Sequence, residues 1–194
     1  LLLRLGFNAP AFLTKLQPRM AAMLSFFQEA DGGLLPANGG GDSGNGIAQA
    51  AMRPHGNVNS KFSFARLSAY QRVQAEGLTV YLDAGPGPDK SNGVHAHAGA
   101  LGLTVDDGPE RLVTSCGANA ELDPVVRDAA RRTAAHSVLS LNGEDSAVFV
   151  VDPNTGVRVP DGPAQLAIRR MEEGDQYLLE GQHGGWRVRH GLIY

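Results

Sequence analysis

Two histidines separated by a single residue, His95 and His97, are the part of this sequence best suited to chemistry. If the segment is an extended strand, side chains at positions i and i+2 lie on one face and place two imidazoles side by side. Adjacent imidazoles can move a proton or bind a metal ion. The sequence has no P-loop, no glycine fingerprint between a strand and a helix, no Cys-x-x-Cys pair and no nucleophile-elbow serine. The pair is therefore the first candidate site.

A third histidine, His136, follows Thr133-Ala-Ala and opens another predicted strand that could belong to the same sheet. Zinc needs three or four converging nitrogen, oxygen or sulfur ligands, and spacing along the chain does not establish convergence. For any single histidine, a solvated or core role is more common than ligation. The residues alone leave a metal site and a structural role both open.

The composition favours a turn-rich β protein. The 194 residues include 25 Gly and 11 Pro but only 7 Phe, 4 Tyr and 1 Trp. The net charge is −3 and no Lys/Arg run exceeds a pair, so nucleic acid is not an expected partner. No apolar run approaches the ~20 residues that span a bilayer, so no membrane span is expected. Cys116 is the single cysteine, which excludes an intramolecular disulfide, and we expect its thiol to be buried.

The first sixty residues read as helix followed by loop. Apolar side chains at helical spacing predict one helix ending near Leu16 and a second over 18–29, because Pro18 should interrupt or restart the helix. Residues 31–61 are rich in Gly, Asn and Ser and predict a connection. We therefore expect the end of a helical domain over 1–30, a glycine-rich connection over 31–61, and a β domain over 62–194.

From residue 62 onward, short runs broken by turn residues predict an antiparallel β-sandwich. Glu76-Gly77, Asp107-Gly108 and Asn142-Gly143 are the predicted turns of three successive hairpins, the last being the strongest turn signal. One helix interrupts the strands, with Asp123 as its cap and Pro124 at its first position. The predicted strands are 64–73, 78–83, 100–105, 111–115, 136–141, 147–152, 166–171, 176–180 and 186–188.

Three segments of the chain resemble motifs of the bacterial heparinase II/III-like polysaccharide lyases. That family's β domain carries a Gly-His-x-His-x-Asp stretch, a hairpin ending near Asp-Pro-Gly, and a Thr-x-x-His-Asn/Ser stretch. Here the corresponding segments are Val94-His-Ala-His-Ala-Gly99, Ser115-Cys-Gly117 and Thr133-Ala-Ala-His-Ser137. Asp31-Gly-Gly-Leu, Asn38-Gly-Gly-Gly, Tyr70-Gln-Arg and Gly181-Gln-His-Gly-Gly-Trp186 are similar to further landmarks of one bacterial branch.

The resemblance implies a helical (α/α) toroid followed by a supersandwich-like β domain, in an enzyme that cleaves uronic-acid polysaccharides by β-elimination. By motif position, His95 is the active-site histidine, and His97 and His136 fall on zinc-ligand positions. The third ligand position, an Asp in the family, is Ser115, and the Asp after the second histidine is Gly99. A serine hydroxyl is a poor zinc ligand, so the resemblance implies zinc only weakly.

The same resemblance implies an acidic polysaccharide as substrate, an upstream toroid as partner, and a location in the periplasm or cell envelope. The chain does not begin with Met, and we expect it to be a fragment that is inactive without the toroid's tyrosine. The alternative is a non-catalytic β-sandwich that binds carbohydrate or supports a neighbouring domain, because a fold does not settle a function.

Overall fold

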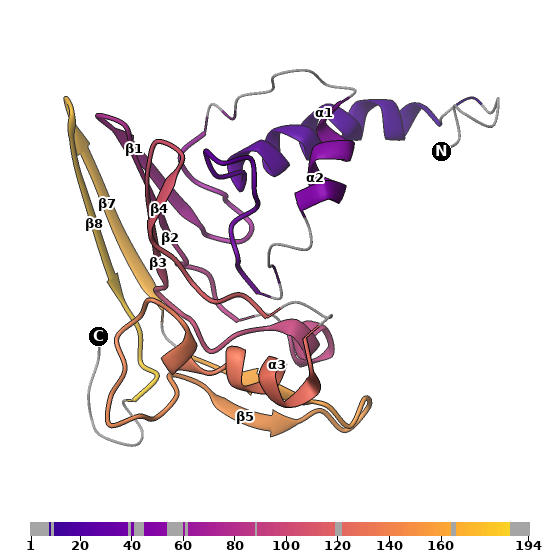
Figure 1. Cartoon of the computed structure of the whole chain (residues 1–194), viewed down its shortest axis with the longest axis vertical. Helices are drawn as coiled ribbons and strands as arrows, with labels where there is room; N and C mark the ends of the chain where they lie inside the picture. The colour runs from indigo at the N-terminus through magenta and orange to yellow at the C-terminus, as the bar shows by residue number, and fades with distance from the viewer. Residues whose placement is uncertain are drawn as a thin grey trace.

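Antiparallel sheets dominate the computed structural model of the chain, which describes residues 8, 10–38, 40, 45–53, 60, 62–87, 89–118, 122–163 and 166–186. A four-stranded sheet has the order β1-β2-β3-β4, and two further pairs are β5-β6 and β7-β8 (Figure 1). The expected mainly β, antiparallel fold class is therefore confirmed. The strands are β1 Gln71–Ala75, β2 Leu78–Leu82, β3 Leu103–Asp107, β4 Glu110–Val113, β5 Val148–Val151, β6 Arg158–Asp161, β7 Ala167–Glu173 and β8 Gln176–Gln182.

The helices are few, and two of them differ from the prediction. They are α1 Ala11–Phe26, α2 Asn45–Met52 and α3 Pro124–Ala130, with short 3-10 helices η4 Lys90–His95 and η5 Thr133–Ala135. The expected break at Pro18 is wrong, since α1 runs through it. Proline removes one backbone donor but does not stop a helix whose remaining hydrogen bonds form. The glycine-rich stretch also contains α2, which its composition concealed.

The first predicted turn, Glu76-Gly77, is confirmed, but the strand predicted over 64–73 is β1 Gln71–Ala75, and Phe64 forms only an isolated bridge to Gln71. Glu76 and Gly77 both have positive φ, 51° and 91°, which matches the right-handed twist of a two-residue β-hairpin. Strand β1 then pairs with β2 from Gln71↔Leu82 to Ala75↔Leu78. In the second hairpin, β3 and β4 pair at Asp107↔Glu110, so the turn lies one residue later than expected.

The third predicted hairpin is wrong. Asn142 and Gly143 do have positive φ, but the turn closes a single bridge, Leu141↔Glu144. The backbone before it bonds elsewhere, since Ser137 O accepts from Leu103 N at 3.0 Å. Strand β5 pairs instead with β6, a strand that the sequence pattern does not predict. Trp186 lies in a turn, and the rest of the predicted strand 186–188 is outside the described residues.

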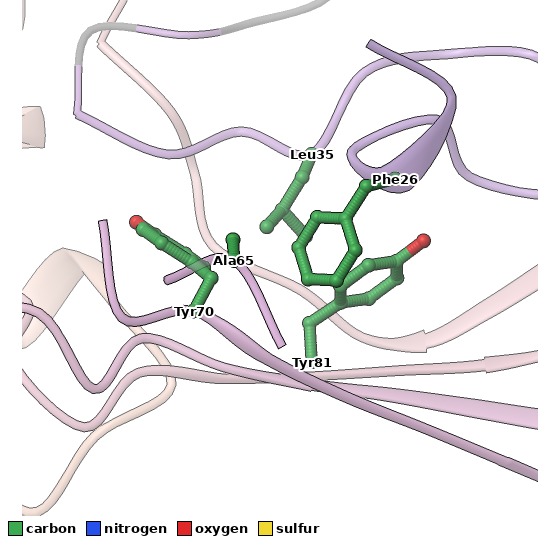
Figure 2. Close-up of a cluster of buried hydrophobic side chains, with 5 residues drawn as sticks. All are labelled: Phe26, Leu35, Ala65, Tyr70 and Tyr81. Atoms are coloured by element: carbon green, nitrogen blue, oxygen red, sulfur yellow. The ribbon is translucent and has the colours of Figure 1, made fainter. Parts of the chain in front are cut away.

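A cluster of buried side chains joins the end of α1 to the four-stranded sheet. Phe26, Leu35, Ala65, Tyr70 and Tyr81 form it, and Figure 2 shows the Phe26 ring lying above Tyr81. The two ring centroids are 6.1 Å apart at 85°. Arg72 places its guanidinium 5.0 Å from the centre of the Phe26 ring and donates to Ser60 O at 2.9 Å. These contacts anchor the helical segment on the sheet.

Cys116 is exposed, so the expected burial of its thiol is wrong. Its backbone N–H donates to Ala135 O at 3.2 Å, in a loop that leaves the side chain at the surface. Among the described residues, no helix is both long and apolar enough to cross a bilayer.

Candidate functional site

The segment that carries His95 and His97 is not a strand, contrary to the prediction. His95 is the last residue of η4, and Ala96 after it is extended with φ −69° and ψ 151°. The two imidazoles therefore do not lie on one face: His95 is exposed, whereas His97 is half-buried between the buried Ala96 and Ala98. Glycine and asparagine in Lys90-Ser-Asn-Gly-Val-His95 explain why a strand does not form there.

Arg131 holds this segment in place. Its Nε donates to Ala96 O at 2.9 Å and its Nη2 donates to Gly93 O at 3.1 Å, so one guanidinium binds the backbone on both sides of His95. Thr133 continues the attachment, because its hydroxyl donates to Ala98 O at 2.6 Å. Both residues are buried. The loop with the two histidines is thus fixed to the segment that precedes His136.

The structure brings His97 and His136 together. Their rings stack with centroids 4.7 Å apart and planes 17° from parallel. A hydrogen bond of 2.5 Å joins Ser115 Oγ and His136 Nδ1. Gly99 makes room for this arrangement, since a Cβ there would lie 3.1 Å from His136 Cγ. The three positions that the family resemblance groups, 97, 115 and 136, are therefore neighbours in space.

A small cavity beside the stacked rings is lined by residues that spacing did not single out for chemistry. The Asn38 side chain accepts from the backbone N–H of His97 through Oδ1 at 3.3 Å. It also donates through Nδ2 to the Tyr70 hydroxyl at 3.3 Å. The Tyr70 hydroxyl in turn donates to Asp83 Oδ2 at 2.7 Å. The cavity measures about 30 Å³, which suits one or two water molecules. A sugar ring does not fit there.

The two stacked imidazoles and the Tyr70 phenol carry no charge at neutral pH. Burial, followed by the neighbouring His136 and Arg131 charges, lowers the pKa of His97 to about 3. Burial also lowers the pKa of His136, against smaller opposing effects of the Arg131 backbone and Asp145. Burial and the adjacent Asp83 raise the pKa of Tyr70 well above its usual value. Both imidazoles are therefore neutral and the phenol is protonated.

The donor set does not fit zinc. Within the described part of the chain, no group of three or more His, Cys, Asp or Glu side chains is placed to hold a metal ion. The third position offers only the Ser115 hydroxyl, which is already bonded to His136 Nδ1. The rings of His97 and His136 stack face to face, whereas zinc ligands converge their nitrogens on one point.

The chain matches the family model for the heparinase II/III-like C-terminal domain over residues 57–194. The protein belongs to this family. Its fold is similar to that of heparinase III, whose crystal structure superimposes with a TM-score of 0.53 at 12% identity, covering 91% of this chain and 31% of that one. The chain is also 26% identical to FtsZ-localized protein C of Caulobacter vibrioides, over 94% of this chain and 32% of that protein. It spans about a third of the length of both.

Proposed function

We propose that the full-length protein is a polysaccharide lyase that cleaves uronic-acid glycans by β-elimination, with His95 as its active-site histidine. The observation that carries the proposal is the exposure of His95 on a segment that Arg131 fixes from both sides. Membership of the heparinase II/III-like family supports the reaction class. In this proposal, residues 1–30 end a helical domain, 31–61 connect it, and 62–194 form the β domain.

β-Elimination removes the proton at C5 of the uronate, breaks the C4–O bond and leaves a C4=C5 double bond, while the departing oxygen takes up a proton. The catalyst must offset the charge of the adjacent carboxylate and supply a base and an acid. We assign His95 to the carboxylate or to proton transfer. Tyr70 and Tyr81 do not suit the base, because both are buried and burial raises the pKa of each. The base is proposed to come from the helical domain.

The test is the ultraviolet absorbance of unsaturated uronate products when the full-length protein is mixed with alginate, polygalacturonate or heparin. We expect product from at least one glycan, and His95→Ala should lower kcat at least a hundredfold without changing the melting temperature, since an exposed side chain contributes little packing. Asn92→Ala, an exposed change on the same 3-10 helix, is the matched control and should retain activity. Wild-type rates in His95→Ala would remove His95 from the mechanism.

A second candidate is a non-catalytic β domain that binds carbohydrate or supports its neighbour. The altered donor set favours it, because Ser115 and Gly99 stand where the family resemblance places carboxylates. The name of the Caulobacter relative, FtsZ-localized protein C, also describes a localization and not a reaction. Binding of a glycan without any unsaturated product would select this candidate. With either function, we propose that the protein lies in the periplasm or cell envelope.

A further inference from the structure

Three arginines surround one aromatic ring beside the histidine segment. The guanidinium carbons of Arg132, Arg131 and Arg158 lie 4.9, 5.4 and 5.7 Å from the centre of the Phe149 ring. Arg131 and Arg132 follow α3, whereas Phe149 and Arg158 come from β5 and β6. Figure 1 shows α3 lying against β5 in the lower part of the molecule. We call Phe149 and these three arginines the Phe149 arginine cluster.

The cluster holds more positive than negative charge. Arg132 pairs with Asp145 at 2.5 Å, and Arg158 approaches Asp128 only to 3.9 Å. Arg127 on α3 adds a further positive charge, which together with Arg158 acts on Arg131. This concentration of like charges stands out in a chain whose net charge is −3. An anion placed there would relieve the repulsion between the guanidinium groups.

Part of the cluster is open to solvent. The Arg158 side chain is 51% exposed and that of Arg132 is 41% exposed, whereas Arg131 is buried. The Arg131 guanidinium donates hydrogen bonds to the backbone of the His95 segment. Arg132 and Arg158, both over the Phe149 ring, are therefore the two members that a ligand can reach.

The cluster is continuous with the segment that carries His95. Arg131 belongs to both, since its guanidinium faces Phe149 and binds Gly93 O and Ala96 O. Strand β6 also packs directly against η4, because a Cβ on Gly93 would lie 3.1 Å from Val159 Cβ. A sugar chain passing His95 would therefore run next to Arg158 and Arg132.

We propose that Arg132 and Arg158, flanking Phe149, form a subsite for a carboxylate-bearing sugar of an acidic polysaccharide whose neighbouring unit lies at His95. The fork of a guanidinium group matches the two oxygens of a carboxylate. Contact with the Phe149 ring holds the two guanidinium groups near each other. This subsite rests on the proposed function for its direction along the glycan, but its binding is independent of turnover.

The experiment compares binding of oligogalacturonate and heparin oligosaccharides to the full-length protein by affinity electrophoresis at low temperature, both in the wild type and with His95→Ala. Arg158→Ala should raise the dissociation constant for acidic oligosaccharides about tenfold. Arg158→Lys should recover part of the lost affinity because it keeps the charge. Arg169→Ala is the matched control, since Arg169 is an exposed arginine paired with Glu180 on the β7-β8 hairpin. It should bind as the wild type does.

Two further arms identify the ligand chemistry. Wild-type binding should fall as sodium chloride rises and should be absent for neutral dextran oligosaccharides. Inorganic sulfate, which carries the charge without the sugar, should compete only at far higher concentration than the oligosaccharide. The salt and dextran arms use the unaltered protein and test the class of ligand, while Arg158→Lys tests the position if Arg158→Ala unfolds.

The proposal is overturned if Arg158→Ala binds like Arg169→Ala or if neutral and acidic oligosaccharides bind alike. It is also overturned if neither the wild type nor His95→Ala binds an acidic oligosaccharide. Its failure is separate from that of the lyase assignment. Cleavage with an unchanged KM in Arg158→Ala would reject the subsite and keep the lyase. Arginine-dependent binding without any unsaturated product would keep the subsite and reject the lyase.

Discussion

His97 and His136 lie in an environment where protonation of either ring is costly. Their rings are stacked 4.7 Å apart, partly shielded from water, with the Arg131 charge nearby. A positive charge on one ring would be poorly solvated and would face the other ring. Both rings are therefore uncharged at neutral pH.

The titration of His97 is a testable consequence. Its pKa is about 3 in the folded protein and 6.5 is the ordinary value, so between these the unfolded chain binds more protons. Stability should therefore fall as the pH drops from 6.5 towards 3. In NMR titrations of the full-length protein, the His97 ring signals should not move between pH 8 and pH 5; a midpoint near 6.5 would contradict this account.

The His97→Asn variant separates this effect from that of Asp83. Burial raises the pKa of Asp83 to about 6, so its contribution to stability is lost as the pH rises through 6, opposite in sign to that of His97. The melting temperature of the wild type should consequently drop more than that of His97→Asn between pH 7 and pH 4.5. Equal drops would mean that His97 does not titrate as the structure indicates.

The metal content of the protein tests whether these side chains bind zinc. Because the donor set of His97, His136 and Ser115 does not fit zinc, the purified full-length protein should contain clearly less than one zinc per chain at this site. A chelator should leave its melting temperature unchanged, since no folding energy depends on the metal. Stoichiometric zinc that disappears in His97→Ala would show that the stacked rings rearrange to bind it.

Among the elements, α3 depends on its cap. It is seven residues long, and Val125 and Val126 on it are 78% and 52% exposed, so burial adds little to its stability. Asp123 Oδ1 accepts from the Val125 N–H at 2.9 Å, and Pro124 occupies the first position, where no backbone donor is needed. Two members of the Phe149 arginine cluster, Arg131 and Arg132, follow directly after this helix.

Asp123→Ala should accordingly destabilise the protein by about 1 kcal/mol, the usual cost of losing a capping side chain. Asp123→Asn keeps an oxygen at the same place and should cost only a few tenths. Urea unfolding of the full-length variants measures both. If the two substitutions were equally harmful, the charge of Asp123 would matter and not its capping hydrogen bond.

Across the whole molecule, the segment after α1 is held to the four-stranded sheet by a buried charge cluster as well as by apolar packing. Arg111 on β4 contacts Glu29 Oε2 at 2.6 Å and Asp31 Oδ2 at 3.0 Å. The Glu29 side chain has no exposed surface. Asp106 on β3 is also buried, and burial raises its pKa against the lowering effect of Arg111. One guanidinium therefore balances several carboxylates.

Removing that guanidinium should cost much more than an exposed ion pair. Arg111→Ala leaves buried carboxylates without their cation, for which losses of about 3–5 kcal/mol are typical. Adding Glu29→Gln to Arg111→Ala should recover part of the stability, because one uncompensated charge is then absent. Urea unfolding of the single and double variants tests this, and simple additivity of the two substitutions would contradict the coupling.

Local signals in the sequence determined the features that depend on neighbouring residues. The Glu76-Gly77 turn and the Asp123-Pro124 helix start were predictable because backbone sterics and capping act over a few residues. The motif segments also identified which residues would become neighbours, since His97, Ser115 and His136 do meet. The roles assigned to His95, His97 and His136 stay predictions.

Only the tertiary structure decided where these side chains point. His95 and His97 separated in exposure because hydrogen bonds from Arg131, 34 or more residues away, hold their segment out of any sheet. The strand expected at 136–141 failed for a similar reason, since Ser137 O bonds to Leu103 N. Asn38, Tyr70 and Asp83 joined the site through long-range packing. Contacts between distant residues outweigh local pattern when each buried backbone group must find a partner.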